Sequence, residues 1–253
     1  MKISVVTVVR DAVTTIEDTL KSVISQDHPD VEHIIVDGAS TDGTREVLDR
    51  YRSHVAQLVS EPDSGIYAAM NKGLRLAGGE VIGFLNADDV YAHAGVLTII
   101  ERVLADPELD ACYADLVYVR RRDITQTIRY WTSQPFRPGL FEHGWLPAHP
   151  TFFVRRDVYE RYGGFDETYQ IQSDFEIALR FLEIYRIQSV YVPEIFVHMR
   201  MGGITNRSLR TIIKGNLESY RACRVHGLRV TPWFFVRKWA TRVPQFVRRP
   251  PAL

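Results

Sequence analysis

The chain has 253 residues, of which 45% are hydrophobic and 25% charged, as is typical of a globular protein, and this length fits either one large α/β domain or one domain plus an appendage. Basic and acidic residues both number 31, so no overall positive charge favours nucleic acid as a partner. No apolar run reaches the roughly 18 residues of a membrane-spanning helix. Because Cys112 and Cys223 have no paired spacing and the N-terminus lacks a signal-type cleavage sequence, we expect a reduced, cytoplasmic protein.

The balanced total hides a basic C-terminal segment. From Ile204 to Leu253 there are eleven basic residues and one acid, Glu218, so this segment has a formal charge of +10. Aromatic residues lie among them, including Trp233 and Trp239. This mixture suits an anionic membrane surface or a phosphorylated partner, and equally a solvated helix packed on the acidic remainder of the chain.

In chain order, the first half alternates apolar runs with helical patterns, which predicts a mostly parallel sheet with crossover helices. We expect strands at residues 2–8, 33–36, 55–59 and 81–85. Helices are predicted at residues 13–26 and 66–76, and one more, capped by Ser40 or Thr41, continues to residue 48. Beyond residue 113 we expect a loop at 135–150, a short strand at 151–154, and helices at 173–185 and 209–223. These elements predict a Rossmann-like, doubly wound α/β sheet flanked by helices.

Carboxylates follow four successive predicted strands. They lie in the segments Arg10-Asp11, Asp37-Gly38, Glu61-Pro62-Asp63 and Asn86-Ala87-Asp88-Asp89. Ligands of doubly wound sheets bind beyond the carboxyl ends of the strands, and clustered carboxylates need a cation or hydrogen-bond donors. No G-x-G-x-x-G loop follows the first strand, which disfavours a dinucleotide dehydrogenase and a P-loop NTPase. A nucleotide held through a metal ion fits this edge better.

Several motifs occur in order along the chain. They are Ser4-Val5-Val6-Thr7, Asp37-Gly38-Ala39-Ser40-Thr41-Asp42-Gly43-Thr44, Glu61-Pro62-Asp63-Ser64-Gly65-Ile66-Tyr67, Ala69-Met70-Asn71-Lys72-Gly73, Gly83-Phe84-Leu85-Asn86-Ala87-Asp88-Asp89, His149-Pro150-Thr151-Phe152-Phe153, Gly163-Gly164-Phe165-Asp166-Glu167 and Ser173-Asp174-Phe175-Glu176. Together they resemble family 2 glycosyltransferases of the GT-A fold, from Lys2 to about Asn206. Similar enzymes assemble bacterial surface polysaccharides from nucleotide sugars, so the resemblance implies a GT-A fold and a nucleotide-sugar donor.

The resemblance assigns donor-binding roles to four residues. Asp37 matches the acceptor of the uracil N3–H, and a carboxylate is a suitable partner for an imide donor. Thr7 matches a residue of the base pocket, while Asp63 and Asn71 match base and ribose contacts. The alternatives are a buried strand residue for Thr7 and a cap of the Ser64-Gly65 turn for Asp63.

The resemblance also implies a metal site and a catalytic base. In the family's metal motif the first carboxylate, here Asp88, contacts ribose, and the last, here Asp89, ligates Mg²⁺ or Mn²⁺ bridging the diphosphate. Asp174 matches the base of an inverting transfer, which removes the proton from the acceptor hydroxyl. The alternatives are an acidic turn for Asp88-Asp89 and a helix N-cap for Asp174. Glu176 is a second choice of base on another face of the helix.

Other residues match the acceptor and diphosphate region. His149 lies in a loop that similar enzymes use near the acceptor, with a structural histidine as the alternative. We expect Arg200, Gly202 and Gly203 to lie in a mobile loop that closes over the diphosphate. His198 fits a core position better than a metal or phosphate site.

The sequence therefore predicts a metal-dependent inverting glycosyltransferase that uses a nucleotide sugar, most simply a UDP-sugar. The expected acceptor is a hydroxyl of a glycan or of a polyprenyl-diphosphate-linked sugar in surface polysaccharide synthesis. Residues 1–206 would form the catalytic domain, and residues 207–253 would bring it to the inner face of the cytoplasmic membrane. The alternatives are a nucleotidyltransferase, which would need a triphosphate loop not seen after the first strand, and a catalytically inert nucleotide-sugar-binding scaffold of an assembly complex.

Overall fold

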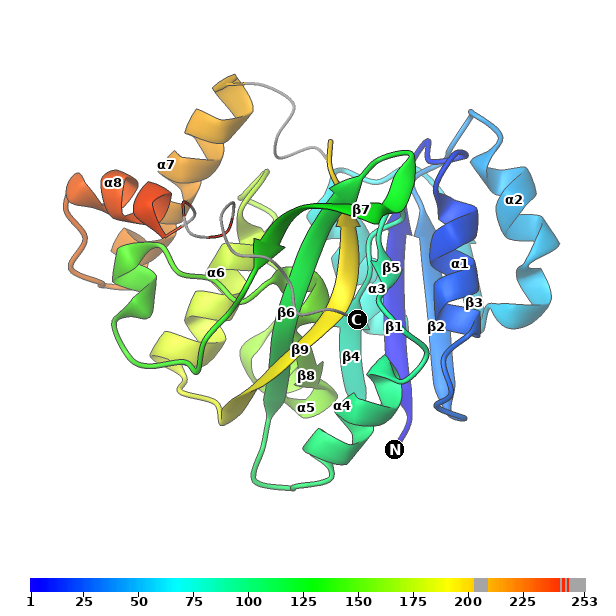
Figure 1. Ribbon diagram of the computed structural model, residues 1–253, viewed down its shortest axis with the longest axis horizontal. Coiled ribbons are helices and arrows are strands. Elements are labelled where there is room, and N and C mark those ends of the chain that lie inside the picture. Colours follow the sequence, from blue (N-terminus) through cyan, green and yellow to red (C-terminus); the bar gives the residue numbers. More distant parts are fainter. Residues whose placement is uncertain (203–208, 242, 244, 246–253) are drawn as a thin grey trace.

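The computed structural model describes residues 1–202, 209–241, 243 and 245, and one nine-stranded sheet runs through them (Figure 1). The sheet has the order β3-β2-β1-β4-β8-β6-β9-β5, with β7 paired to β6. The strands are β1 (Ile3–Val9), β2 (Val31–Asp37), β3 (Gln57–Ser60), β4 (Val81–Phe84), β5 (Val90–Tyr91), β6 (Ala111–Arg120), β7 (Asp123–Trp131), β8 (Phe153–Arg155) and β9 (Ser189–Arg200). The helices are α1 (Ile16–Ile24), α2 (Thr44–Arg50), α3 (Ile66–Leu76), α4 (Val96–Leu104), α5 (Arg156–Tyr162), α6 (Ser173–Leu179), α7 (Leu209–Val225) and α8 (Trp233–Ala240).

The N-terminal half has the predicted parallel βα units. All seven residues of β1 are buried, as expected for a central strand covered on both faces, and β1 pairs in parallel with β2 and β4. Gly73 lets α3 approach this strand closely, because a Cβ atom there would lie only 2.3 Å from a methyl of Val6. The predicted α/β class with a GT-A-like sheet is thereby confirmed for this half.

The second half of the sheet is mixed. β8 is antiparallel to both β4 and β6, β7 is antiparallel to β6, and β5 is antiparallel to β9, whereas β6 and β9 run parallel. The sequence pattern predicted neither of the long strands β6 and β9. The helix expected at 173–185 is present, but its second half, Arg180–Ile184, is a π-helical turn.

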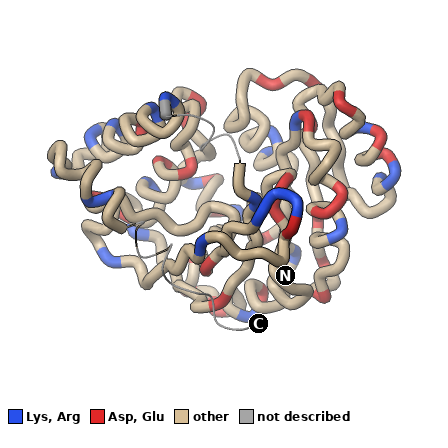
Figure 2. Tube along the Cα trace, turned by 45° about the horizontal axis from the view of Figure 1, so that its top comes forward, with Lys and Arg blue, Asp and Glu red and all other residues tan. Residues whose placement is uncertain are grey.

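The C-terminal helices share a core with the sheet. One apolar cluster includes Val6 and Phe84 of the parallel strands together with Cys223 of α7 and Phe234 of α8. Phe234 is 1% exposed, and its ring meets that of Phe175 edge-on. Basic residues are spaced along α7 (Figure 2), and Arg210, Lys214, Arg221 and Arg224 are exposed. The described part of the basic segment is therefore packed on the body of the protein, while the expected boundary at 206/207 falls outside the described residues.

Candidate active site

The carboxyl ends of the parallel strands meet at one edge of the sheet, as predicted. Val9 is paired with Asp37, and Asp37 with Ser60. The Asp37 carboxylate is fully buried and accepts hydrogen bonds from the backbone N–H and hydroxyl of Ser40 and, at 2.6 Å, from the Ser60 hydroxyl. Its expected contact with a base would add to this network or replace part of it.

Three other residues matched to donor binding also have protein partners. The hydroxyl of Thr7 is buried and lies 3.0 Å from Nε2 of His33. The carboxylate of Asp63 accepts a 2.6 Å hydrogen bond from Lys72. Asn71 bonds both the N–H and the C=O of Phe165, so it holds the Gly163-Gly164-Phe165 turn against α3. Their roles in donor binding stay predictions.

Asp88 and Asp89 follow β4 and differ in exposure. Asp89 is fully buried, where it accepts hydrogen bonds from the Asn86 side chain at 2.9 Å and from the backbone N–H of Arg200 at 3.3 Å. Burial, and next the charge of Asp88, raise the pKa of Asp89 well above its usual range. Asp88 is only partly buried and is the more accessible of the two carboxylates.

The donor set of this pair fits a hard divalent cation. Two adjacent carboxylates, one of them destabilised by burial next to the other, gain from a positive charge placed beside them. Within the described part of the chain, no group of three or more His, Cys, Asp and Glu side chains could hold a metal ion. Mg²⁺ commonly takes one or two protein carboxylates and completes its shell with phosphate oxygens and water, which matches a site of this size.

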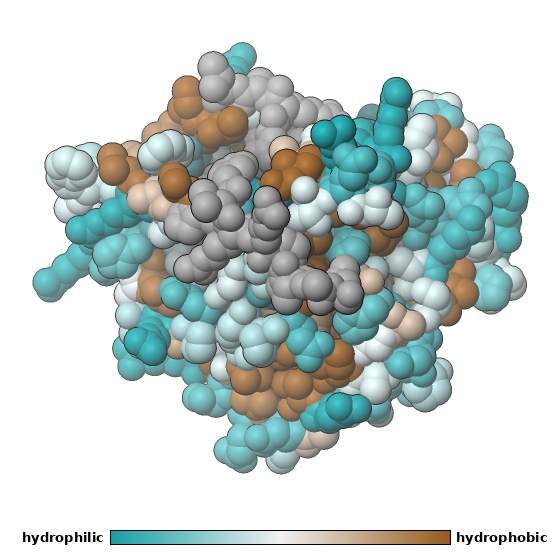
Figure 3. Space-filling view, viewed as in Figure 1, coloured by the Kyte–Doolittle hydropathy of each residue, from teal (hydrophilic) through white to brown (hydrophobic). Residues whose placement is uncertain are grey.

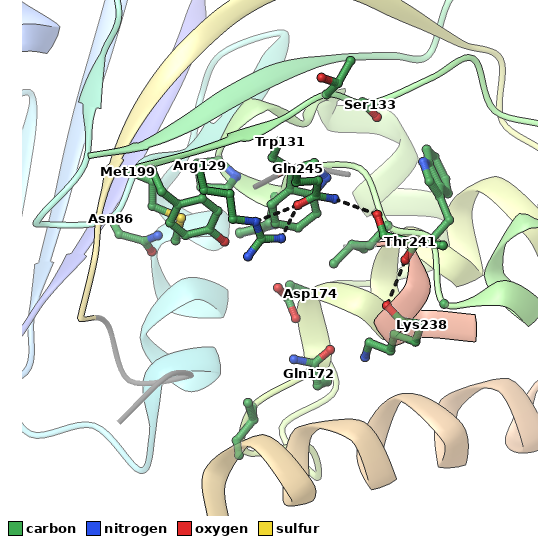
Figure 4. A pocket seen from close by; sticks show the side chains of 18 of the residues that line it. Asn86, Arg129, Trp131, Ser133, Gln172, Asp174, Met199, Lys238, Thr241 and Gln245 are labelled. Atoms are coloured by element: carbon green, nitrogen blue, oxygen red, sulfur yellow. Dashed lines mark hydrogen bonds between the residues drawn. The ribbon is translucent and has the colours of Figure 1, made fainter. Parts of the chain in front are cut away.

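A cavity of about 460 Å³ lies beside this edge (Figure 4). Among the residues chosen from sequence, Asp174, His149 and Arg200 line it, together with Asn86 from the metal motif. Asp174 projects from the first turn of α6 into the space between Arg129 and the Gln172–Lys238 side, as Figure 4 shows. The cavity lining does not include the other predicted donor and metal residues, all of which the structure describes: Thr7, Asp37, Asp63, Asn71, Asp88 and Asp89.

The carboxyl group of Asp174 is tuned by its surroundings. Burial raises its pKa to about 6, while the hydrogen bond from the N–H of Phe175 and the charge of Lys238 act in the opposite direction. Tyr67 of α3 faces the same group: its pKa is raised by burial and next by the charge of Asp174. A carboxyl group with a pKa in this range can accept a proton near neutral pH and release it afterwards.

Of the two remaining candidates, His149 lines the cavity and Glu176 does not. His149 packs against the rings of Phe84 and Phe165, its Nε2 has no hydrogen-bond partner in the described structure, and burial lowers its pKa to about 4. It therefore faces the cavity as a neutral imidazole. Glu176 is not in the cavity lining: its buried carboxylate forms an ion pair with Arg180 at 2.8 Å and lies at hydrogen-bond distance, 2.8 Å, from Nε2 of His226, which leaves Asp174 as the base candidate.

The prediction that Arg200 lies in a mobile loop is wrong. Arg200 ends β9, is 5% exposed, and is held by the backbone oxygens of Asp88 and Arg121 and by an ion pair with Asp18. These contacts fix the guanidinium beside the metal motif. Gly203 lies outside the described residues. His198 lies in β9 and lines a different cavity.

Sequence reasoning missed the residues that the C-terminal helix and β7 bring to the cavity. Lys238, Thr241 and Gln245 line it from the basic segment, and Arg129 and Trp131 from β7. The side chain of Arg129 donates to Gln245 and lies over the ring of Trp131. Phe234 and Lys238 are four residues apart, so they share a helix face, but a buried lysine is too rare to be expected from pattern alone.

Comparison with known families gives one match over most of this architecture. The family model described as "Glycosyl transferase family 2" matches residues 4–163. This range includes β1 to β4, the acidic edge and His149, but ends before Asp174.

Relatives and solved structures agree with that match. TuaG of Bacillus subtilis, whose name assigns it provisionally to teichuronic acid biosynthesis, is 47% identical over 94 residues, or 35% of this chain and 36% of that protein. A PGL/p-HBAD biosynthesis glycosyltransferase of Mycobacterium tuberculosis is 25% identical over 74% of this chain and 72% of its own length. Two solved structures share the fold: S. aureus TarS 1–349 with UDP (TM-score 0.67, 20% identity, 94% of this chain and 68% of that one) and the Pyrobaculum calidifontis mannosyltransferase PcManGT with GDP-Man and Mn²⁺ (0.65, 21%, 95% and 73%).

Proposed function

The chain belongs to glycosyl transferase family 2, and from this premise we propose that it is an inverting glycosyltransferase that uses a nucleotide sugar, with a UDP-sugar as the first choice of donor. The acceptor in this proposal is a hydroxyl of a glycan or of a polyprenyl-diphosphate-linked sugar. TarS has been solved with UDP and with UDP-GlcNAc, and TuaG is named for teichuronic acid biosynthesis, which supports both choices.

The observation that carries the proposal is the placement of Asp174. Its carboxyl group projects into the cavity and has a pKa raised to about 6, and Asn86, which comes just before Asp88 and Asp89 in the chain, lines the same cavity. Inverting transfer needs one such carboxylate, which takes the proton of the acceptor hydroxyl while the oxygen attacks the anomeric carbon. No second carboxylate among the described residues lines this cavity, in contrast to the paired acids of many glycoside hydrolases.

The rest of the lining suits a sugar acceptor that carries phosphate. Trp131 and Trp145 offer flat apolar surfaces, and Arg129, Arg200 and Lys238 bring positive charge to the same cavity. Asp89 would hold Mg²⁺ or Mn²⁺, which supplies positive charge that offsets the charge of the leaving diphosphate, and Asp88 beside it would contact the ribose. Asp37 and Thr7 would bind the base at the ends of β2 and β1.

The first test is calorimetric titration of the purified chain with UDP, GDP and dTDP, each with and without Mn²⁺. We expect UDP to bind and Mn²⁺ to strengthen its binding. Turnover is then measured as release of UDP from UDP-sugars in the presence of glycan acceptors. Binding without turnover of any donor would favour the inert scaffold, and no binding of any nucleotide would overturn the proposal.

We also propose that the outer face of α7 and α8 contacts an anionic membrane surface. On α8, Trp233, Val236 and Trp239 are 67%, 54% and 70% exposed, and on α7, Ile213 and Leu217 are 60% and 55% exposed. Figure 3 shows apolar side chains on the face over these helices. Exposed tryptophans beside arginines and lysines are typical of interfacial helices. None of the helices within the described ranges is long and apolar enough to span a bilayer.

Flotation with liposomes tests this surface. The wild type should float with phosphatidylglycerol-containing vesicles and much less with neutral vesicles. Replacing both Trp233 and Trp239 with Ala should abolish flotation, while Ile128→Ala, at an apolar position 40% exposed on β7, serves as the control. Equal flotation with neutral and anionic lipid would contradict the electrostatic part of the proposal, and no flotation with either would contradict all of it.

A further inference from the structure

Glu218 of α7 is tied to the segment that leads into the catalytic base. It is 8% exposed and is the one acid in the C-terminal basic segment. Its two carboxylate oxygens accept hydrogen bonds from three successive backbone N–H groups, those of Gln170 (3.2 Å), Ile171 (2.9 Å) and Gln172 (3.0 Å). Gln172 is the N-cap residue of α6, two residues before Asp174. A carboxylate shared by three successive backbone donors fixes the path of this segment.

A second link runs from α8 to the same segment. Nζ of Lys238 donates a 2.6 Å hydrogen bond to the hydroxyl of Ser219, which lies 2.8 Å from the side-chain oxygen of Gln172. All three side chains are buried, with exposed fractions of 4%, 0% and 7%. The ammonium group also lies 5.2 Å from the ring of Phe175, the residue after Asp174. Lys238 is therefore linked to the chain before the base through Ser219 and lies against the residue that follows it.

Two glycines permit this close packing. A Cβ atom at Gly144 would lie 2.4 Å from Cβ of Lys238, and one at Gly215 would lie 3.2 Å from the Ile171 side chain. Helix α8 thus packs directly on the loop that follows η2 (Leu140–His143), and α7 packs on the segment before α6. Because these two glycines lack a Cβ atom, both helices can pack close to the segment that carries the base.

We propose that Glu218 and Lys238 are positioning residues for Asp174, so that the C-terminal helices form part of the catalytic site of this chain. The inference rests on the proposed function, because it concerns the base of the same reaction. Glu218 holds the backbone that places the carboxyl group, and Lys238 anchors Gln172 while its charge faces the cavity.

The charges of the two residues act on Asp174 with opposite sign. Lys238 lowers the pKa of Asp174, and Glu218 raises it. Other titratable groups that act on Asp174 or line the cavity are Tyr67, Arg129, His143, His149 and Arg200. Glu218→Gln and Lys238→Met keep the approximate side-chain size, remove one charge each, and leave these other groups in place.

The test measures the titration of Asp174 by NMR of the full chain labelled at aspartate carboxyl carbons, with Asp174→Asn used for assignment. Glu218→Gln should move the titration to lower pH, and Lys238→Met should move it to higher pH. A purely structural loosening would not move it in opposite directions. Turnover of the donor used by the wild type should fall by about tenfold or more in kcat in both variants, with UDP affinity changed by less than about twofold. Arg224→Ala, an exposed position on α7, is the control and should leave both readouts unchanged.

The inference would be overturned if both variants had the same Asp174 titration and the same kcat as the wild type. Shifts in the same direction, together with weakened UDP binding, would also overturn it. If Glu218→Gln does not fold, the direction in which Lys238→Met moves the Asp174 titration decides the test on its own. The NMR titration needs no turnover, so a wild-type protein that fails to transfer sugar would contradict the proposed function while this inference is still decided.

Discussion

Asp174→Asn should stabilise the folded protein at neutral pH while abolishing transfer. Burial raises the pKa of Asp174 from an ordinary 3.8 to about 6, so ionising this group costs more in the folded chain than in the unfolded one. Each pKa unit corresponds to about 1.4 kcal/mol, and the shift therefore removes up to about 3 kcal/mol of folding free energy above pH 6. Asparagine keeps the acceptor oxygen for the N–H of Phe175 without the charge.

The stability difference between Asp174→Asn and the wild type should depend on pH. Below the unfolded pKa both states bind the proton, and the variant should then equal the wild type in stability. Its advantage should grow as the pH rises from about 4 to about 6 and stay constant above that. Urea unfolding at several pH values, followed by fluorescence, measures the difference, and Asp49→Asn on the exposed side of α2 is the control. Equal stability of Asp174→Asn and the wild type at pH 8 would refute the argument that burial tunes the base, and retained turnover would refute its role.

Three other changes test the metal pair and the packing of the C-terminal helices. Asp89→Ala should abolish the gain in UDP affinity that Mn²⁺ provides in calorimetry, and an unchanged gain would contradict the assignment. Gly144→Ala should cost about 1–3 kcal/mol more in urea unfolding than Gly139→Ala, because both glycines have positive φ but only Gly144 lies against Lys238. Phe234→Ala should lower the stability of the whole chain by about 3–5 kcal/mol in one calorimetric transition, whereas a separate C-terminal transition would show that α8 is not part of the common core.

The sequence allowed the parallel half of the fold to be predicted because its signals are local. β1 is an almost unbroken run of β-branched residues, and α3 begins and ends at the predicted residues Ile66 and Leu76. Strands β1 to β3 are each followed by a helix, which predicts parallel neighbours, and β4 then returns to pair with β1 on its other side. The position of Asp37 and Asp89 near one edge follows from that topology without any knowledge of side-chain packing.

The second half depends on contacts between distant segments. β6 pairs with β9, about 80 residues later in the chain, and the register shifts near Asp115, so no short pattern indicates this pairing. Asp174 was identified from its motif, but its pKa is set first by burial, and the charges that act on it come from distant residues, Lys238 on α8 and Glu218 on α7. Periodicity identifies the apolar face of a helix but not which distant loop covers it.

The packing of α8 reconciles the two alternatives that composition left open for the basic segment. Phe234 and Lys238 face inward, one in the core and the other toward the cavity, whereas Trp233, Val236 and Trp239 face outward. A helix divided in this way can pack on the body and still present aromatic residues to a surface, so the two readings do not compete. In our proposals the helix that meets the membrane is also a wall of the acceptor cavity. Lipid-linked substrates would then be bound and oriented by opposite faces of the same two turns of helix.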